Sequence, residues 1–183
     1  TLNNLGKALT DLGEVKSARD YLERALVINE QQYGYTDIRV AVVLTNVGNA
    51  RGDLGLFVEA SEAFSRALEI YEEHGAQLAN PLVDLGNARG CLGDHVGKRD
   101  LFQRALPMYE ALHGRRSERV AYVLAGIGET YGDLGDERMQ PMVEEALSIY
   151  EELQMEPEIA STLLLLATCM GHKGAFDKQK ELV

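Results

Sequence analysis

The sequence is poor in the residues that mark several protein classes. Its 183 residues include only two cysteines, Cys91 and Cys169, which are too few for a disulfide framework and show no metal-type spacing. Both lie among apolar neighbours in helical patterns, which favours small core residues and a cytoplasmic or other reducing compartment. No stretch approaches the roughly 18 consecutive apolar residues of a membrane span, and no signal peptide is visible. These absences argue against a disulfide-stabilised secreted domain and against direct membrane insertion.

Positive charge is also scarce. The chain has 18 Lys and Arg against 29 Asp and Glu, a net charge of −11. A negative surface repels nucleic acids and anionic membranes, so neither is predicted as a partner. It suits a basic or neutral peptide or protein, although an acidic surface can also serve solubility alone. The apolar content of 45% is that of a folded chain.

A ladder of small residues runs the length of the chain. In five places a glycine or alanine is followed seven positions later by a glycine: Gly6/Gly13, Gly48/Gly55, Gly86/Gly93, Gly128/Gly135 and Ala167/Gly174. The first members are 42, 38, 42 and 39 residues apart, and the text around them repeats, as in LNNLGKALTDLG and LTNVGNARGDLG. A repeat of this length indicates a solenoid built from similar structural units.

Each unit carries two apolar stripes of helical period, joined by a short turn such as Asp53-Leu54-Gly55. So few connecting residues place the two helices antiparallel. The predicted fold class is therefore all-α, an α-solenoid of antiparallel helix pairs with about ten helices. First helices are predicted at about 1–11, 37–52, 80–91, 118–132 and 158–171, and second helices at about 15–32, 56–73, 96–112, 138–153 and 176–183.

The repeats then span about 1–35, 36–76, 77–116 and 117–156, followed by an incomplete repeat over 157–183. Because the sequence opens and stops inside repeats, we expect the chain to be part of a longer protein. Three prolines are expected to disturb the pattern. Asn80 and Pro81 resemble a helix cap and the first helical residue, Pro141 is expected to start another helix, and Pro107 should bend the helix that contains it.

The mid-helix glycines need a structural reason, because glycine inside a helix costs up to about 1 kcal/mol relative to alanine. We expect that reason to be close approach of the two helices in a pair. The facing small residues are predicted to be Ala25, Ala67, Ala105 and Ala146. Larger residues beside the contact, such as Leu5, Leu22 and Phe64, are predicted to fill the remaining space.

These residues resemble tetratricopeptide repeats. Leu44 and Val47-Gly48 match the first helix of that pattern, and Ala60, Phe64 and Ala67 match the second. The long period, with phrases such as TLNNLG and RALEIYEEHG, is similar to the repeats of kinesin light chains. The resemblance implies a right-handed superhelix whose concave groove is lined by the first helices.

Two arginines depart from the family pattern. Arg51 and Arg89 replace the first-helix aromatic residue, which Tyr131 retains. Each arginine either crosses to the neighbouring repeat and reaches an acidic partner, or is simply exposed.

The resemblance also implies which residues face the groove, namely those one turn before and one residue after the small position. The candidate peptide-binding residues, with the Asn that follows Thr45 included, are Asn3, Lys7, Thr45, Asn46, Asn49, Asn87 and Glu129. An asparagine side chain both donates and accepts, so Asn49 and Asn87 suit the backbone of an extended peptide, or else they bind only water.

Two further features bear on the ligand. The carboxylate clamp that some family members use needs a lysine where Asn3 stands and an asparagine where Lys7 stands, so a chaperone-tail ligand is not expected. Near the other end, Leu164 and Leu165 replace polar residues. They form either a ligand pocket or a surface that a following repeat covers.

The sequence shows no catalytic chemistry. His74, His95, His113 and His172 are widely separated and have neither metal-ligand spacing nor a nucleophile motif. The glycines around Gly126 follow no predicted strand, so they do not indicate a dinucleotide site. We predict that the chain is not an enzyme and has no catalytic residue, metal or cofactor.

The leading hypothesis is a protein–protein interaction scaffold that binds a peptide or protein segment in its groove. Two alternatives remain open. The chain can be an architectural spacer or assembly subunit that contacts neighbours through its convex face or edges. It can also be a regulatory arm of a larger multidomain protein.

Overall fold

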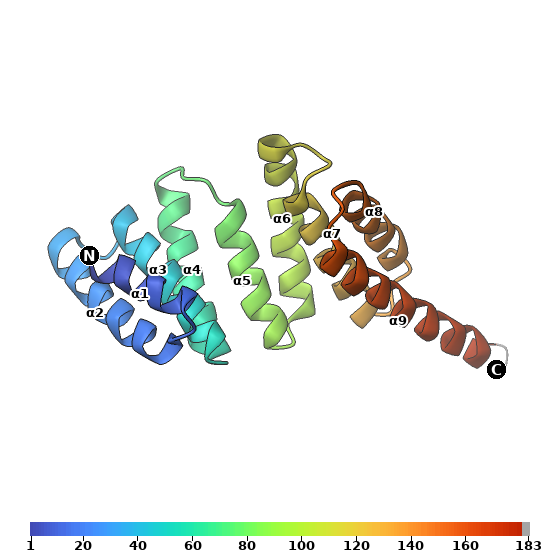
Figure 1. Cartoon of the computed structure of the whole chain (residues 1–183), viewed down its shortest axis with the longest axis horizontal. Coiled ribbons are helices and arrows are strands. Elements are labelled where there is room, and N and C mark those ends of the chain that lie inside the picture. The colour runs from blue at the N-terminus through green and yellow to red at the C-terminus, as the bar shows by residue number, and fades with distance from the viewer. Residues whose placement is uncertain (181–183) are drawn as a thin grey trace. The chain divides into compact units, whose positions relative to one another are not determined.

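A computed structural model describes residues 1–180 of the chain, with side chains up to residue 168. Within these residues the chain forms nine α-helices and no strand (Figure 1). The helices are α1 (Leu2–Asp11), α2 (Val15–Tyr33), α3 (Ile38–Asp53), α4 (Phe57–Glu73), α5 (Ala79–Cys91), α6 (His95–His113), α7 (Glu118–Asp133), α8 (Met139–Glu152) and α9 (Glu156–Lys180). The all-α prediction is confirmed, and the ends of the first eight helices lie within about two residues of the prediction.

The helices fall into two compact units, residues 1–94 and the residues from His95 onward. We call them the N-terminal and C-terminal units and describe each by itself. In the N-terminal unit each helix from α1 to α4 packs on the next one along the chain, and α3 also contacts both α1 and α5. In the C-terminal unit α6, α7, α8 and α9 pack in the same consecutive way. Consecutive packing of this kind is the arrangement of a helical solenoid.

The predicted turns close as expected. After α3, the backbone N–H of Gly55 donates to the carbonyl of Gly52 at 2.8 Å, and that of Leu56 donates to the carbonyl of Arg51 at 2.9 Å. Gly55 has a φ of 76°, which glycine adopts at little cost. The second helices of the first three repeats are followed by glycines of positive φ, whereas Gln154, with a φ of 57°, occupies that place after α8.

The start of α3 is fixed by a side-chain cap. The carboxylate of Asp37 accepts a hydrogen bond from the backbone N–H of Arg39 at 2.9 Å and from its guanidinium at 2.7 Å. Both hydrogen bonds hold the pKa of the Asp37 carboxyl well below its ordinary value, and the bond from the Arg39 guanidinium has the larger effect. A capped helix start places the face of α3 firmly relative to the turn before it.

The close helix contact at the small residues is confirmed in three repeats. A Cβ atom added to Gly48 would lie 2.6 Å from Cε1 of Phe64, and one added to Gly6 would lie 2.4 Å from Cγ of Leu22. In the third case the nearest atom is Cγ2 of Val143, 2.5 Å from a Cβ at Gly128. The detail of the prediction was wrong, because the large residue itself lies over the glycine and the facing alanine does not. Leu5, predicted as filler, is 44% exposed.

The fifth repeat differs from the prediction. A turn near Gly174 was expected, with a second helix over 176–183, but α9 runs from Glu156 to Lys180 without a break. The triplet there is His172-Lys173-Gly174, and it lacks the Leu-Gly pair that the other four turns share. Residues 181–183 of the predicted helix lie outside the described residues.

The prolines give a mixed outcome. α5 begins at Ala79, so Asn80 lies inside the helix and does not cap it, and Pro81 is its third residue. Pro141 is the third residue of α8, close to the predicted start. Pro107 lies inside α6, which nevertheless continues to His113.

Candidate peptide-binding face

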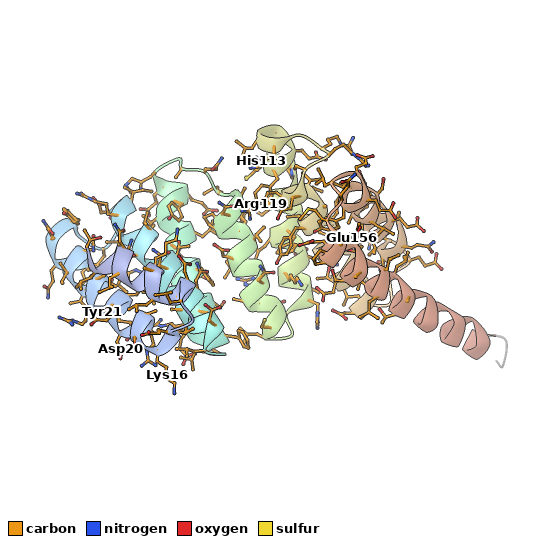
Figure 2. The ribbon with its side chains drawn as sticks, in the orientation of Figure 1. Lys16, Asp20, Tyr21, His113, Arg119 and Glu156 are labelled. Atoms are coloured by element: carbon orange, nitrogen blue, oxygen red, sulfur yellow. The ribbon has the colours of Figure 1, made fainter. Side chains whose placement is uncertain are left out.

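The first helices of the N-terminal unit lie next to one another, because α3 contacts both α1 and α5. We call the surface that these three helices share the first-helix face. Six of the seven predicted binding residues belong to its helices: Asn3 and Lys7 on α1, Thr45, Asn46 and Asn49 on α3, and Asn87 on α5. The side chains of Lys16, Asp20 and Tyr21, labelled in Figure 2, belong to the second helix α2 and are not part of it.

One side of α3 supplies most of the candidate residues. Thr45, Asn46 and Asn49 recur at steps of one, three and four residues, so they lie on one side of the helix. Thr45 and Asn46 are half-buried and Asn49 is exposed, whereas their sequence neighbours Leu44 and Gly48 are buried. The polar side of α3 therefore faces away from the core.

The clearest feature of the face is a hydrogen bond between two repeats. The side-chain Nδ2 of Asn46 donates to Oδ1 of Asn3 at a distance of 2.8 Å. Both side chains are half-buried. Each amide keeps unused capacity in this arrangement, because Asn3 still has its two N–H donors and Asn46 still has its carbonyl oxygen. The pair thus presents a donor group and an acceptor side by side.

The neighbouring candidates differ in how much capacity they retain. The hydroxyl of Thr45 donates to the carbonyl of Ala41 at 3.0 Å, so it remains only an acceptor. Asn49 and Lys7 are exposed, and Asn87 is half-buried. Lys7 is the one charged residue among the candidates of this unit.

Glu129, the seventh candidate, is placed differently. It lies on α7 in the C-terminal unit and forms an ion pair with Lys98 of α6, with 2.5 Å between Nζ and Oε2. Lys98 is the more buried partner, with 14% of its side chain exposed against 50% for Glu129. Glu129 therefore links two adjacent repeats of the C-terminal unit.

The two arginines that replace the first-helix aromatic residue, Arg51 and Arg89, form ion pairs with different kinds of partner. Arg51 reaches Glu23 in the preceding repeat, 3.0 Å from Nη2 to Oε1, as one of the two alternatives predicted. Arg89 instead lies 3.7 Å from Asp94 in its own repeat. Tyr131, at the equivalent position, accepts a hydrogen bond at its hydroxyl from Gln103 at 3.0 Å. Arg51 and Tyr131 each contact the residue 28 positions earlier, so both link consecutive repeats.

Sequence reasoning missed one residue of the face. Val42 lies one turn before Thr45 and Asn46, on the same side of α3, and is 44% exposed. Tyr122 holds the same position in α7, six residues before the small residue, and is 43% exposed. The sequence shows an apolar residue at this position in α3 and α7, but Asn80 and Ser161 hold it in α5 and α9, and only the structure shows that Val42 and Tyr122 are exposed.

The described residues hold no group of three or more His, Cys, Asp or Glu side chains that could bind a metal ion. Of the helices in the same residues, none has the length and apolar character needed to cross a bilayer. Leu164 is 68% exposed on α9.

Comparison with known proteins defines the class. The chain has the fold of a helical-repeat solenoid, and residues 1–73 match the tetratricopeptide repeat in sequence. BtubC (BKLC) from P. vanneervenii is similar with a TM-score of 0.81 and 24% identity, over 100% of this chain and 75% of that one. A putative kinesin light chain with nearly identical TPR-like repeats, from Podosopora anserina, is similar with a TM-score of 0.79 and 14% identity. The match covers 99% of this chain and 89% of that one.

A third similar structure belongs to a larger protein. It is a signal transduction ATPase with numerous domains and a tetratricopeptide repeat sensor, from Pyrococcus horikoshii, with a TM-score of 0.77 and 16% identity. The match covers 92% of this chain and 26% of that one. No curated protein matches the chain in sequence. The resemblance to tetratricopeptide repeats, kinesin light chain-like structures included, is confirmed for the fold.

Proposed function

We propose that the chain is a protein-binding scaffold that holds an extended peptide segment on the first-helix face. Tetratricopeptide repeats mediate protein–protein interaction as a class, because stacked helix pairs offer a long preformed surface. The proposal goes further by naming the face and the chemistry of the ligand.

The observation that carries the proposal is the Asn46–Asn3 pair. An extended peptide presents alternating N–H and C=O groups that must find partners when it leaves water. The paired amides offer donors on Asn3 and an acceptor on Asn46 within one contact. Asn49, one turn further along α3, offers a second amide, and Val42 offers an apolar contact for a peptide side chain. These groups would bind mainly the backbone of the peptide, and Val42 would add one contact with a peptide side chain.

The charge of the chain narrows the ligand class further. The six candidate residues on the first-helix face include only one charged side chain, that of Lys7. The whole chain has a net charge of −11, and this overall negative charge attracts positively charged ligands. A neutral or basic peptide is therefore favoured over an acidic one.

The test uses a library of short random peptides selected on the immobilised chain. The dissociation constant of a selected synthetic peptide is then measured for Asn46→Ala, Asn49→Ala and the double variant. Loss of one or two hydrogen bonds should weaken binding about tenfold, which corresponds to about 1.4 kcal/mol. The control is Glu62→Ala, an exposed substitution on the second helix α4.

Thermal unfolding must stay unchanged in all variants for the comparison to hold. Unaltered affinity in the asparagine variants would remove the first-helix face from the proposal. Weaker binding in the Glu62→Ala variant alone would favour the architectural alternative, in which contacts run through the second helices.

The structure from Pyrococcus horikoshii favours a second candidate function. There a similar array is described as the sensor of a larger ATPase. By analogy, the chain can act as the regulatory arm of a multidomain protein, with ligand binding on the same face as its input. Peptide binding that leaves the rest of the full-length protein unaffected, in activity and in domain contacts, would count against this second role.

A further inference from the structure

The ends of three helices meet within the C-terminal unit. Short turns connect α7 to α8 and α8 to α9, so α8 runs antiparallel to both of the helices on which it packs (Figure 1). The last turn of α8, which contains Tyr150, therefore lies beside the first turns of α7 and α9. Those first turns contain acidic residues, Glu118 in α7 and Glu156 and Glu158 in α9.

Tyr150 is a buried side chain whose polar end reaches the surface. The residue is only 4% exposed, and among the described residues its hydroxyl has no hydrogen-bond partner. Within the same residues, no side-chain oxygen or nitrogen atom that is itself buried lacks a partner. The hydroxyl oxygen of Tyr150 is therefore accessible while its ring is packed in the core. A polar atom held in this way has capacity to bind a ligand.

Two carboxylates lie near this hydroxyl. Burial first, and then the negative charges of Glu158 and Glu118, raise the pKa of Tyr150 to about 12. The hydroxyl therefore stays protonated at neutral pH. Glu118 is exposed and Glu158 is half-buried, and neither carboxylate has an ion-pair partner among the described residues. We call the two carboxylates and the hydroxyl the Tyr150 site.

An aromatic ring lies next to the site. Tyr122 follows Glu118 by one turn on the same side of α7, and it is 43% exposed. Its charge state also affects the pKa of Tyr150, so the two tyrosines are close together. The ring of Tyr122 contacts that of Phe102 on α6, with 6.2 Å between the centroids, which restrains it. A restrained, accessible ring beside carboxylates suits a flat cation that can stack on it.

Repeat packing accounts for the tyrosine but not for the acids. A tyrosine lies four residues after the alanine of three second helices, at Tyr71, Tyr109 and Tyr150. Nine residues before the small residue, the first helices that follow carry Gln77, Arg119 and Glu158. The charge at this place is therefore reversed between α7 and α9. The helix dipole favours an acid in the first turn, but Glu156 already supplies one in α9.

The arginines near the site do not neutralise it. Arg116, in the loop before α7, pairs with Glu152 and donates to the hydroxyl of Ser148. Arg119, labelled in Figure 2, directly follows Glu118, and consecutive residues of a helix do not face each other. Among the described residues, Arg119 has no ion pair with either carboxylate. The negative charge of the Tyr150 site thus remains available to a ligand.

We propose that the Tyr150 site binds the guanidinium group of an arginine that belongs to another protein. Glu118 and Glu158 accept hydrogen bonds from its N–H groups, the hydroxyl of Tyr150 accepts one more, and the ring of Tyr122 stacks on its plane. Arginine fits these groups better than lysine, because it offers five donors in one plane. The site belongs to α7, α8 and α9 alone, so it does not depend on the first-helix face.

The experiment titrates the whole chain with a capped peptide, acetyl-Gly-Ala-Arg-Ala-Gly-amide, and follows the ring signals of labelled tyrosines by NMR. Tyr122→Phe and Tyr150→Phe assign the two signals of interest. We expect saturable shifts of both signals. A peptide with citrulline in place of arginine keeps the shape but lacks the charge, and it should bind at least about tenfold more weakly. A lysine peptide should bind less tightly than the arginine peptide.

Variants of the chain test the individual groups. Glu118→Gln and Glu158→Gln should each weaken binding about fivefold, because each removes a charged acceptor. Tyr150→Phe should weaken it about threefold without lowering the melting temperature, because the hydroxyl has no hydrogen bond to lose in the free chain. A merely structural tyrosine would leave the affinity unchanged. The matched control is Glu156→Gln, which removes the same charge from the same turn and should change the affinity less than about twofold.

Four results would overturn the proposal. Equal binding of the citrulline peptide would show that no guanidinium is recognised, and tighter binding of the lysine peptide would assign the site to an ammonium group. An equal loss in Glu156→Gln and Glu158→Gln would reduce the effect to general attraction by an acidic chain. Loss of binding in the full-length protein would assign the site to an arginine of the protein's own chain. None of these results bears on the asparagine variants of the first-helix face.

Discussion

Two glycines of α3, four residues apart, have opposite surroundings. Gly48 lies under the ring of Phe64, and a Cβ atom there would meet three ring atoms at 2.6 to 2.8 Å. Gly52 also lies within the helix, but a Cβ atom there would meet no atom within 4 Å apart from its chain neighbours and the nearby backbone of α3 itself. The sequence shows the same residue type at both sites. Only the structure distinguishes a glycine required by packing from one that is merely tolerated.

This difference leads to a paired prediction. Gly48→Ala should lower the free energy of unfolding by about 1–3 kcal/mol, because Phe64 must move to admit a methyl group. Gly52→Ala should raise it by about 0.5–1 kcal/mol, because alanine favours the helix and meets no obstacle. Urea denaturation followed by circular dichroism measures both. Shifts of the two variants in the same direction would contradict the assigned roles.

The candidate site could be predicted in part from the sequence, and the reasons lie at the residue scale. The repeat register places Asn3, Asn46 and Asn49 on first helices, and that placement is correct. The hydrogen bond between Asn46 and Asn3 depends on side-chain rotamers across 43 residues, which a repeat pattern does not specify. The pairing of Glu129 with Lys98 was missed for the same reason.

At the scale of elements, the two prolines of α6 and α8 have unlike positions. Pro107 lies in the interior of α6, thirteenth of its 19 residues, where its ring removes a backbone hydrogen bond. Pro141 lies in the first turn of α8, where the N–H groups have no partner within the helix. The cost of each proline should therefore differ even though both lie in second helices.

We predict that Pro107→Ala stabilises the chain by about 1–3 kcal/mol, since an interior proline costs about 3 kcal/mol against alanine and the fold already absorbs part of it. Pro141→Ala should change stability by less than about 0.5 kcal/mol. Thermal unfolding of both variants provides the measurement. If Pro107→Ala is neutral while Pro141→Ala stabilises, then the interior proline relieves a strain that the helix would otherwise carry.

The ends of elements were predictable wherever a local signal specified them. The turns that contain Leu-Gly were located correctly, because a glycine of positive φ ends each first helix. The fifth turn was predicted from spacing alone, and there α9 continues as a helix through Gly174. Spacing records where a turn would fall in an ideal repeat, whereas the local residues determine whether the backbone turns.

At the scale of the whole molecule, charge is the property that composition determines most directly. The net charge of −11 acts at a distance, so it influences how fast a partner arrives more than how long it stays. The first-helix face carries little charge of its own among its candidate residues, with only Lys7 ionised. One experiment should therefore separate two effects: the net charge of the chain should change the association rate of a peptide, and contacts with the first-helix face should determine its dissociation rate.

The experiment compares two forms of a peptide selected on the first-helix face, one extended by two lysines and the other by two glutamines. At low ionic strength the lysine form should associate several-fold faster, because the field of the chain attracts it. At physiological ionic strength the Debye length is about 8 Å, so the advantage should largely disappear. Dissociation rates, read from the same surface plasmon resonance traces, should agree between the two forms. A difference in dissociation instead would locate an acidic contact within the site, and the ligand would then be recognised by a specific ion pair and not by the long-range field.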